Sequence, residues 1–214
     1  NEIPLYNAVN GELVAVSDTE GIDFESALHY GRTVGYKNLS SMTFYDRGEM
    51  LKKVALYLLE RKKKYYELSY KTGATHADSW VDIEGGFGTF FTYSGLAKRM
   101  LPNTPFWVDG DTQKISANGT FLGTHILTPS EGVSVQINAY NFPVWGMMEK
   151  LSTSLLAGVP SIVKPATPGS YLTNAVFQDM IESEILPEGA IQLVCGEPGN
   201  ILDYVQDGDS VLFT

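Results

Sequence analysis

The stretch VSVQINAYNFPVWGMMEKLSTSLLAGVPSIVK, residues 133–164, decides how the second half of the chain is expected to fold. It begins and ends with short apolar runs of strand length, and the segment between them, 144–157, is predicted to be helical. A second helical segment is predicted at 170–184. The apolar runs of this half lie at 133–137, 161–164, 190–194 and 210–213. Strands that alternate with helices predict right-handed βαβ units, so we expect a doubly wound α/β layer with a mainly parallel sheet.

Polar and glycine residues directly follow three of these predicted strands, at 138–141, 164–167 and 195–199. Ligands of open α/β sheets bind at the carboxyl ends of the strands, so these three loops are the candidate site. A G-x-G-x-x-G fingerprint is absent, and the residues alone therefore indicate a dinucleotide only weakly.

Three residues in these loops have both a structural and a functional interpretation. Asn141, placed before Phe142-Pro143, could cap a helix, or its amide could donate a hydrogen bond to a developing oxyanion. Lys164 could extend to solvent, or it could bind an anionic or hydroxyl-rich ligand. Cys195 closes an apolar strand with no histidine nearby in sequence, which favours a small buried side chain over a nucleophile.

The first 100 residues are predicted to be helical, with segments at 23–37, 42–72 and 78–99. Thr43 and Asp46 approximate a capping box, and Gly73 is a plausible helix stop. The glycine-rich run EGGFG at 84–88 resembles a phosphate-binding loop. It follows no predicted strand, however, so close helix packing explains it better. From 101 to 129 the chain turns polar and is expected to form a hairpin or arm. We therefore divide the chain into a helical portion (1–100), an oligomerisation arm (101–129) and half a dinucleotide-binding domain (130–214).

Composition limits the possible partners. The chain has 214 residues, a net charge of −10 and a pI near 4.7, which argues against nucleic acid and anionic membranes as partners. The basic run ERKKKYY at 60–66 is interpreted as a solvated helix face. One cysteine and three scattered histidines (His29, His76 and His125) predict neither a disulfide nor a metal site. We expect a cytoplasmic protein, and a chain that starts without Met and stops at SVLFT is interpreted as part of a longer one.

Several motifs in order resemble those of the aldehyde dehydrogenase superfamily. They are NAYNFPVWGMMEKL, LLAGVPSIVKPAT, LPEGAIQLVCG and VLFT. Within that family, KTGATHADSWVDIEGGFGTFFTYS is similar to the dehydrogenase half of bifunctional ring-opening proteins of bacterial phenylacetate degradation. The resemblance implies NADP-dependent oxidation of a CoA-linked semialdehyde to the acid in an oligomeric parent protein. Semialdehyde dehydrogenases of benzoyl-CoA degradation are the alternative.

The resemblance also implies roles for individual residues. Asn141 matches the asparagine that helps to bind the oxyanion, and Lys150 matches a lysine that supports the active site. The residues that match cofactor-binding positions are Ile137, Asn138, Ala139 and Tyr140 on the nicotinamide-ribose side, Lys164, Ala166 and Thr167 near the adenosine ribose, Gly196 near the adenine, and Phe213 beside the cofactor.

Thr167 is the position that the resemblance uses to choose the cofactor. Many NAD-preferring relatives have Glu there, and its carboxylate would repel a 2′-phosphate. A small neutral Thr removes that repulsion and leaves room beside Lys164, so NADP is expected over NAD, although NAD stays possible.

The family's nucleophilic cysteine and general-base glutamate would lie beyond residue 214, and Cys195 does not match the nucleophile. We therefore expect the isolated chain to be inactive toward aldehydes. Two other functions stay open at this point: a non-catalytic nucleotide-binding module, which would not need Asn141, and a structural piece whose arm pairs with another subunit.

Overall fold

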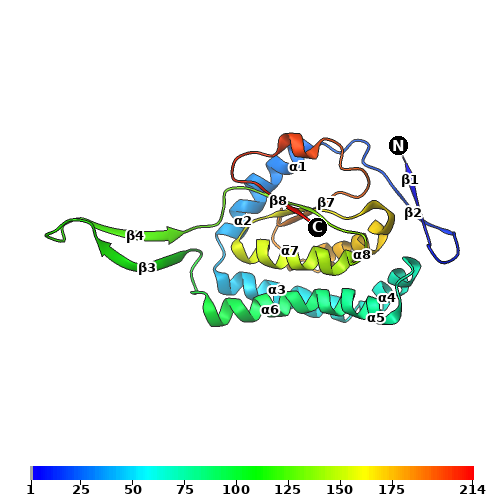
Figure 1. Ribbon diagram of the computed structural model, residues 1–214, viewed down its shortest axis with the longest axis horizontal. Helices are drawn as coiled ribbons and strands as arrows, with labels where there is room; N and C mark the ends of the chain where they lie inside the picture. Colours follow the sequence, from blue (N-terminus) through cyan, green and yellow to red (C-terminus); the bar gives the residue numbers. More distant parts are fainter. Residues whose placement is uncertain (1) are drawn as a thin grey trace.

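The computed structural model describes residues 2–214 and has a parallel sheet with helices on both faces (Figure 1). The strands of this sheet are β5 (Ser134–Ile137), β6 (Ser161–Lys164), β7 (Ile191–Leu193) and β8 (Ser210–Phe213). Among the described residues they are ordered β7-β6-β5-β8, and every pair is parallel. Helices α7 (Pro143–Ala157) and α8 (Ser170–Glu182) cross from β5 to β6 and from β6 to β7. The order reverses at β5, which confirms the predicted doubly wound arrangement.

The strand register brings the ends of the three central strands together. Ile137 at the end of β5 pairs with Lys164 of β6 on one side and with Phe213 of β8 on the other. The pairing continues one residue further, because the Asn138 amide donates to the Lys164 carbonyl (3.0 Å) and the Thr214 amide donates to the Ile137 carbonyl (3.1 Å). The loops that carry the candidate site therefore start from one edge of the sheet.

Helices α7 and α8 lie directly below the sheet, and a further helical layer packs beneath them (Figure 1). This further layer consists mainly of α3 (Phe44–Leu59), α4 (Lys62–Lys71) and a long third helix over residues 76–100. The predicted capping box is confirmed: the Thr43 hydroxyl and the Asp46 carboxylate each accept from the other residue's backbone amide. The prediction of a single helix over 42–72 is wrong, because the backbone breaks at Arg61, whose φ and ψ are −105° and 0°. Gly73 ends α4 in the left-handed region, with φ +89°, where a side chain would be strained.

Two helices carry a wider turn that the sequence did not indicate. The segment predicted at 23–37 is α1 (Phe24–Tyr30), a π-helical turn η1 (Gly31–Gly35) and α2 (Tyr36–Ser40). The segment predicted at 78–99 is α5 (His76–Trp80), a π-helical turn η2 (Val81–Gly85) and α6 (Gly86–Met100). Such turns insert one residue and re-aim the side chains that follow.

The third helix consists of α5, η2 and α6, and its glycines at 85 and 86 are explained by close packing against α7. A Cβ on Gly85 would lie 2.3 Å from Cζ3 of Trp145, and a Cβ on Gly86 would lie 3.1 Å from the Trp145 Cα. The packing interpretation of EGGFG is therefore confirmed for these two positions. Gly88 has open space around it and is not part of the contact.

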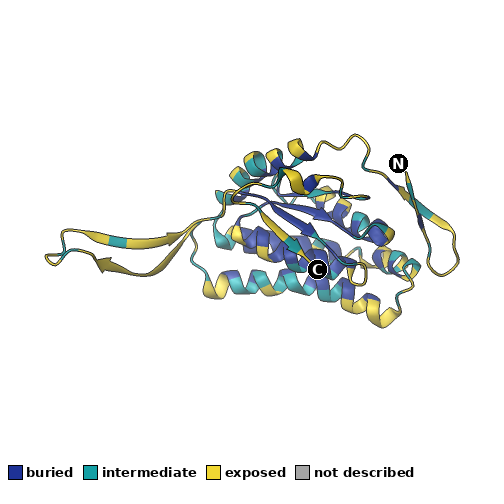
Figure 2. Cartoon of the chain, turned by 45° about the horizontal axis from the view of Figure 1, so that its top comes forward, coloured by how far each residue is buried: buried dark blue, intermediate teal, exposed yellow. Residues whose placement is uncertain are grey.

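The core has two parts, one on each face of the sheet (Figure 2). The larger part joins α3, α6, α7 and α8 below the sheet. The smaller part lies above it, under α1 and the short 3-10 helix η4 (Ile201–Tyr204). The residues of the smaller part are Phe24, Leu28, Val133, Val135, Ile162, Val194 and Ile201. Burying each such side chain stabilises the fold by about 1.5–3 kcal/mol, which is why the four apolar runs predict the sheet so well.

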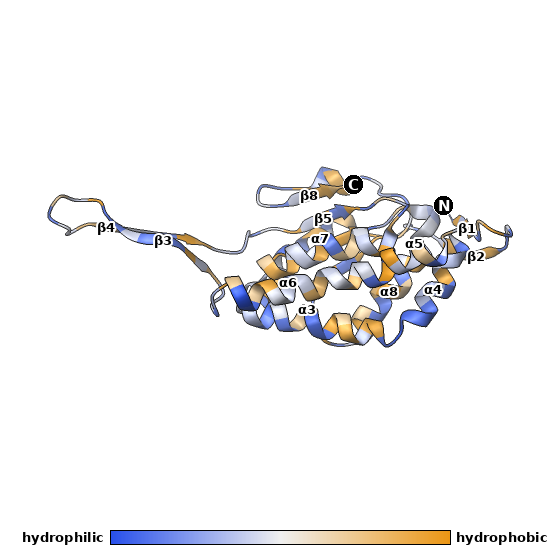
Figure 3. Ribbon diagram, turned by 60° about the horizontal axis from the view of Figure 1, so that its bottom comes forward, coloured by the Kyte–Doolittle hydropathy of each residue, from blue (hydrophilic) through white to orange (hydrophobic). Residues whose placement is uncertain are grey.

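Two hairpins lie outside this body. The hairpin β1 (Ile3–Tyr6) and β2 (Leu13–Ser17) lies near α8, and the hairpin β3 (Trp107–Lys114) and β4 (Leu122–Leu127) projects away as a long arm (Figure 1). The predicted hairpin within 101–129 is thus present. Buried and exposed residues do not alternate along its strands, because nearly every residue is exposed. The exposed residues include apolar side chains, and orange segments in Figure 3 mark hydrophobic residues of the arm. The division into three domains stays a prediction.

None of the helices in residues 2–214 is long and apolar enough to cross a bilayer.

Candidate functional site

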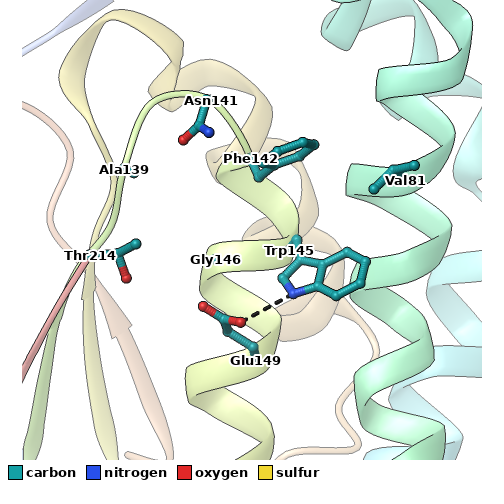
Figure 4. Close-up of a pocket in the computed structure, with 8 residues that line it drawn as sticks. All are labelled: Val81, Ala139, Asn141, Phe142, Trp145, Gly146, Glu149 and Thr214. Atoms are coloured by element: carbon teal, nitrogen blue, oxygen red, sulfur yellow. Dashed lines mark hydrogen bonds between the residues drawn. The ribbon is translucent and has the colours of Figure 1, made fainter.

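A pocket of about 330 Å³ lies where β5 and β8 end and α7 begins (Figure 4). Its walls come from four places: the loop after β5, the first two turns of α7, the end of β8 and the turn η2 of the neighbouring helix. The lining residues are Val81, Ala139, Asn141, Phe142, Trp145, Gly146, Glu149 and Thr214. Most of this wall is apolar, so the amide of Asn141, the carboxylate of Glu149 and the hydroxyl of Thr214 are the polar side-chain groups of the lining that can orient a ligand.

Asn141 does not cap α7, so the capping interpretation is wrong. The cap position belongs to Phe142, which makes no side-chain cap, and Pro143 starts the helix. The Asn141 side chain is exposed and has no hydrogen-bond partner among residues 2–214. Its amide is therefore free to donate to an oxygen in the pocket, as an oxyanion donor must be.

The first amides of α7 are satisfied by a residue that sequence reasoning missed. Oδ1 of Asp82, on η2, accepts from the backbone amides of Val144 (3.0 Å) and Trp145 (2.8 Å). Asp82 is 3% exposed, and this burial raises the pKa of its carboxyl to about 7, although the two amide donors act to lower it. A carboxylate at a helix N-terminus also interacts favourably with the helix dipole. Asp82 thus holds the start of α7, and with it the loop that carries Asn141.

The second turn of α7 contributes a linked set of polar groups. Trp145 Nε1 donates to Glu149 Oε2 (3.1 Å), a contact drawn in Figure 4. Lys150 is buried, and its Nζ donates to the Gly146 carbonyl (3.1 Å) and lies 3.4 Å from Glu149 Oε1. Lys150 therefore braces the turn below the pocket and does not line the pocket itself. The i, i+4 spacing of Trp145 and Glu149 was the available sequence signal for their pairing.

The other predicted loops form a second cluster, at the ends of β6 and β7. Lys164 Nζ donates to Thr167 Oγ1 (3.2 Å), and Thr167 Oγ1 donates to the Gly196 carbonyl (3.0 Å). Ala166 precedes Thr167 as the cap of the 3-10 helix η3 (Thr167–Gly169). Burial lowers the pKa of Lys164, while the neighbouring Glu197 acts to raise it. The structure therefore brings together the residues predicted for the adenosine side.

Cys195 lies beside this cluster and is partly exposed. Burial raises the pKa of its thiol above the ordinary value, although a hydrogen bond with Ser170 and the charge of Lys164 oppose that shift. A raised pKa leaves little thiolate at neutral pH, and the thiolate is the reactive form. The prediction of a small buried side chain is wrong in its burial, because Cys195 is intermediate in exposure; that it does not act as a nucleophile stays a prediction.

The loop at 137–140 behaves differently from residue to residue. Ala139 lines the pocket, whereas the Tyr140 hydroxyl donates to the Thr72 carbonyl (3.2 Å) and ties the loop to the end of α4. Asn138 is 4% exposed, and neither atom of its side-chain amide has a hydrogen-bond partner within residues 2–214. Phe213, the β8 residue that pairs with Ile137, is 77% exposed. An unpartnered buried amide is costly in isolation, so the Asn138 side of this edge fits a bound ligand.

The chemistry of these groups fits a nicotinamide dinucleotide better than a metal. A buried lysine side chain, a hydroxyl and a tight glycine turn can hold ribose hydroxyls and phosphates, and the apolar pocket can hold an uncharged ring. No group of three or more His, Cys, Asp or Glu side chains in the described part of the chain could hold a metal ion.

Known proteins match the chain over its whole length. The aldehyde dehydrogenase family model matches residues 1–214. A 3,4-dehydroadipyl-CoA semialdehyde dehydrogenase of Aromatoleum evansii is 37% identical over 211 residues, covering 98% of this chain and 41% of that protein. An aminoaldehyde dehydrogenase 2 of Solanum lycopersicum is 25% identical over 221 residues, covering all of this chain and 42% of that protein. The chain thus spans about two fifths of the length of these relatives.

Solved structures give the same match in space. PnpE in complex with nicotinamide adenine dinucleotide superposes with a TM-score of 0.84 at 23% identity, over 100% of this chain and 42% of that one. A 3,6-anhydro-L-galactose dehydrogenase in complex with NADP gives a TM-score of 0.80 at 26% identity, over 94% of this chain and 41% of that one. The fold of the chain is that of these dehydrogenases.

Proposed function

The chain belongs to the aldehyde dehydrogenase family, and from that premise we propose that it serves the NADP-dependent oxidation of a CoA-linked semialdehyde to the acid. The observation that carries the proposal is the pocket at the end of β5, where the unpartnered amide of Asn141 faces a mostly apolar space. Since the chain spans about two fifths of its relatives, the activity of the whole protein is part of the proposal. A cytoplasmic location is part of it as well.

The substrate class is supported by the Aromatoleum relative, whose name specifies a CoA-linked semialdehyde as its substrate. An identity of 37% over nearly the whole chain supports a shared substrate class more than the lower identities of the aminoaldehyde and betaine aldehyde relatives do. Bacterial degradation of aromatic acids, through phenylacetate or through benzoyl-CoA, is the setting that the sequence resemblance favours.

Asn141 supplies electrostatic stabilisation in this proposal. When an aldehyde carbonyl is attacked, negative charge develops on its oxygen, and an amide donor fixed in advance stabilises that charge. Asp82 and Lys150 hold the first turns of α7 in place, so Asn141 needs little reorganisation to act. Phe142 and Trp145 give the pocket an apolar wall beside the Asn141 amide.

The cofactor is held, in this proposal, by Lys164, Thr167 and Gly196 at one end and by the 137–140 loop and Phe213 at the other. NADP, when bound, accepts the hydride of the aldehyde. Thr167 is neutral and lies 3.2 Å from the Lys164 ammonium, so the site offers a positive charge and no carboxylate at the position expected for the 2′-phosphate. Glu197 is exposed, and water screens its repulsion.

The test is an assay of the full-length protein with a CoA-linked semialdehyde and either NADP or NAD, following reduced nicotinamide by its absorbance. The proposal expects turnover with both cofactors and a higher kcat/KM with NADP. Absence of aldehyde oxidation with either cofactor would contradict the function, and a preference for NAD would contradict the cofactor assignment.

We also propose that the arm of residues 101–129 pairs with a second copy of the chain. A two-stranded hairpin is marginally stable by itself, and this one exposes Trp107, Val108, Ile126 and Leu127. Its unpaired strand edges are ready to add to another sheet.

A further inference from the structure

A second pocket, of about 270 Å³, lies on the outer face of the helical layer, between α4 and the start of the third helix. We call this surface the aromatic–lysine patch. Its lining residues are Lys62, Lys63, Tyr66, Tyr70, His76, Trp80 and Glu84. The patch contains part of the basic run at 60–66, which the sequence alone interpreted as a solvated helix face, and α4 is largely blue in Figure 3.

The aromatic rings of the patch offer flat surfaces to solvent. Tyr66 stacks on His76 with ring centroids 5.4 Å apart and an interplanar angle of 28°, and it lies 6.2 Å from the ring of Tyr70. Trp80 is 55% exposed and Tyr70 is 40% exposed. Exposed indole and phenol rings grouped around a pocket are suited to stacking on the base of a nucleotide.

Only some of the basic side chains near these rings form ion pairs or ring contacts with other described residues. Arg61, Lys62, Lys63, Lys64 and Lys71 are five of the chain's 15 basic side chains. Lys64 pairs with Asp179 on α8 (2.6 Å), and Arg61 lies over the ring of Tyr57 (3.5 Å). Neither of these two cations faces the patch.

Within the patch, one lysine is paired and one is free. Lys62 pairs with Glu84 at 2.9 Å, and the same Glu84 oxygen accepts from the Tyr66 hydroxyl at 2.8 Å, so the one carboxylate of the patch is compensated. Lys63 is exposed and has no hydrogen bond or ion pair among residues 2–214. A free ammonium beside exposed rings can contact a phosphate group.

The patch and the aldehyde pocket lie on neighbouring faces of one helix. Trp80 lines the patch, while the next residue, Val81, lines the aldehyde pocket. One turn later, Glu84 faces the patch and Gly85 packs on the indole of Trp145 in the pocket wall. Figure 4 shows the side chain of Val81 directed toward Phe142 and Trp145. A long, flexible substrate with its aldehyde at Asn141 could therefore reach around this helix.

We propose that the aromatic–lysine patch binds the nucleotide end of the CoA thioester, the 3′-phosphorylated ADP group, by stacking on the adenine and contacting its phosphates through Lys63. The inference rests on the proposed function, because it needs a CoA-linked aldehyde. Rings and cations of this kind also occur in nucleic-acid sites, but the net charge of −10 disfavours a polyanion of that length.

The test compares two substrates in the full-length protein: a CoA-linked semialdehyde and the free semialdehyde acid with the same acyl chain. The variants are Trp80→Ala, Lys63→Glu and, as a matched control, Lys37→Glu, which makes the same charge change at an exposed residue of α2. We expect Trp80→Ala to raise KM for the CoA-linked substrate roughly tenfold. Lys63→Glu should raise it roughly threefold. The free aldehyde and Lys37→Glu should show no comparable change.

A binding measurement separates this proposal from effects on turnover. Titration of the NADP-saturated protein with adenosine 3′,5′-bisphosphate should release heat for the wild type and Lys37→Glu, and little for Trp80→Ala. If the wild type oxidises neither aldehyde, the proposed function itself fails. If it oxidises aldehydes but the patch variants affect both substrates equally or neither, the patch proposal alone is overturned.

Discussion

Asn141, Asp82 and Thr167 each depend on neighbours far away in the sequence. Asp82, 62 residues before Val144, accepts from the first amides of α7, so the exposed side chain of Asn141 is not needed there and stays unpartnered among residues 2–214. The Thr167 hydroxyl donates a hydrogen bond to the Gly196 carbonyl (3.0 Å). At the scale of single residues, function therefore depends on which hydrogen bonds are already made and which are left for a ligand.

Thr167→Glu should reverse the cofactor preference. A carboxylate at this position would lie near Lys164 and could accept from ribose hydroxyls, but it would repel a 2′-phosphate. We expect kcat/KM for NADP to fall by roughly tenfold or more, while that for NAD changes little or rises. Steady-state kinetics with both cofactors test this, with Thr167→Gln as the uncharged control. An equal loss with both cofactors in Thr167→Glu would contradict the assignment.

Asp82 should make stability depend on pH. Its pKa is raised to about 7 in the folded state, above the ordinary value of 3.8, so the folded protein binds this proton more tightly than the unfolded chain. The contribution of Asp82 to the free energy of unfolding is therefore greatest below pH 4 and falls as the pH rises toward 7. The steepest slope is about 1.4 kcal/mol per pH unit. Urea unfolding of wild type and Asp82→Asn between pH 4 and 8 measures this.

Asparagine keeps the oxygen that accepts from the amides of Val144 and Trp145 but does not titrate. The difference in stability between Asp82→Asn and the wild type should thus shift in favour of the variant as the pH rises from 4 to 7. Parallel pH profiles for the two proteins would show that the Asp82 carboxyl does not titrate in this range.

At the scale of secondary-structure elements, the contact of the third helix with α7 determines the shape of the pocket at the end of β5. Gly85 and Gly86 allow the two helices to approach until the backbone of one meets the indole of Trp145 on the other. The indole in turn is one wall of the pocket and is held by Glu149 (3.1 Å). A change in this helix contact therefore alters the pocket without touching Asn141.

Gly85→Ala should destabilise the protein, whereas Gly88→Ala should not. The new Cβ at 85 would lie 2.3 Å from the Trp145 ring, so the indole must move, at a cost of about 1–3 kcal/mol. At 88 no atom lies within 4 Å, and Ala in a helix is more favourable than Gly by about 0.5–1 kcal/mol. Thermal unfolding of both variants measures the difference. A Gly85→Ala protein as stable as Gly88→Ala would show that the contact is not tight.

Most elements of the fold follow from local signals in the sequence. The four apolar runs became β5 to β8, and the Thr43–Asp46 pattern became a capping box, because burial of apolar strands and local capping act within a few residues. The break at Arg61 was missed because the apolar spacing continues across it to Tyr65. The π-helical turns η1 and η2 could not be predicted, because the amino-acid composition of these segments does not distinguish them from an α-helix.

The candidate site could be predicted only in part, for a related reason. Polar loops at successive strand ends pointed to the edge of the sheet where the structure has the pocket, and Lys164, Thr167 and Gly196 lie together there. The roles of Asp82 and Glu149, and the unpartnered amide of Asn138, depend on packing between distant segments, which no local pattern contains.

At the scale of the whole molecule, the compact layered body contrasts with the arm of β3 and β4 (Figure 1). The arm makes its cross-strand hydrogen bonds, but its apolar side chains have no cover in the chain. Such a surface is costly in a monomer and useful in an assembly.

Changing the arm should therefore change assembly and leave the body folded. We expect the double variant Val108→Glu and Ile126→Lys, at cross-strand partner positions, to lower the particle mass of the full-length protein. Light scattering after size exclusion measures the mass, and circular dichroism checks that the body is intact. The complementary charges should keep the hairpin paired. A mass equal to that of the wild type would contradict the role of the arm.

The central claim, that the amide of Asn141 acts on the reacting carbonyl at the end of β5, is tested most directly by the kcat of Asn141→Ala in the full-length protein at saturating NADP and aldehyde. The account predicts a loss of roughly 100- to 1000-fold in kcat with a much smaller change in KM for NADP, because the lost hydrogen bond forms with charge that develops during reaction. A kcat within a few-fold of the wild-type value, in a variant that is folded and binds NADP, would contradict it.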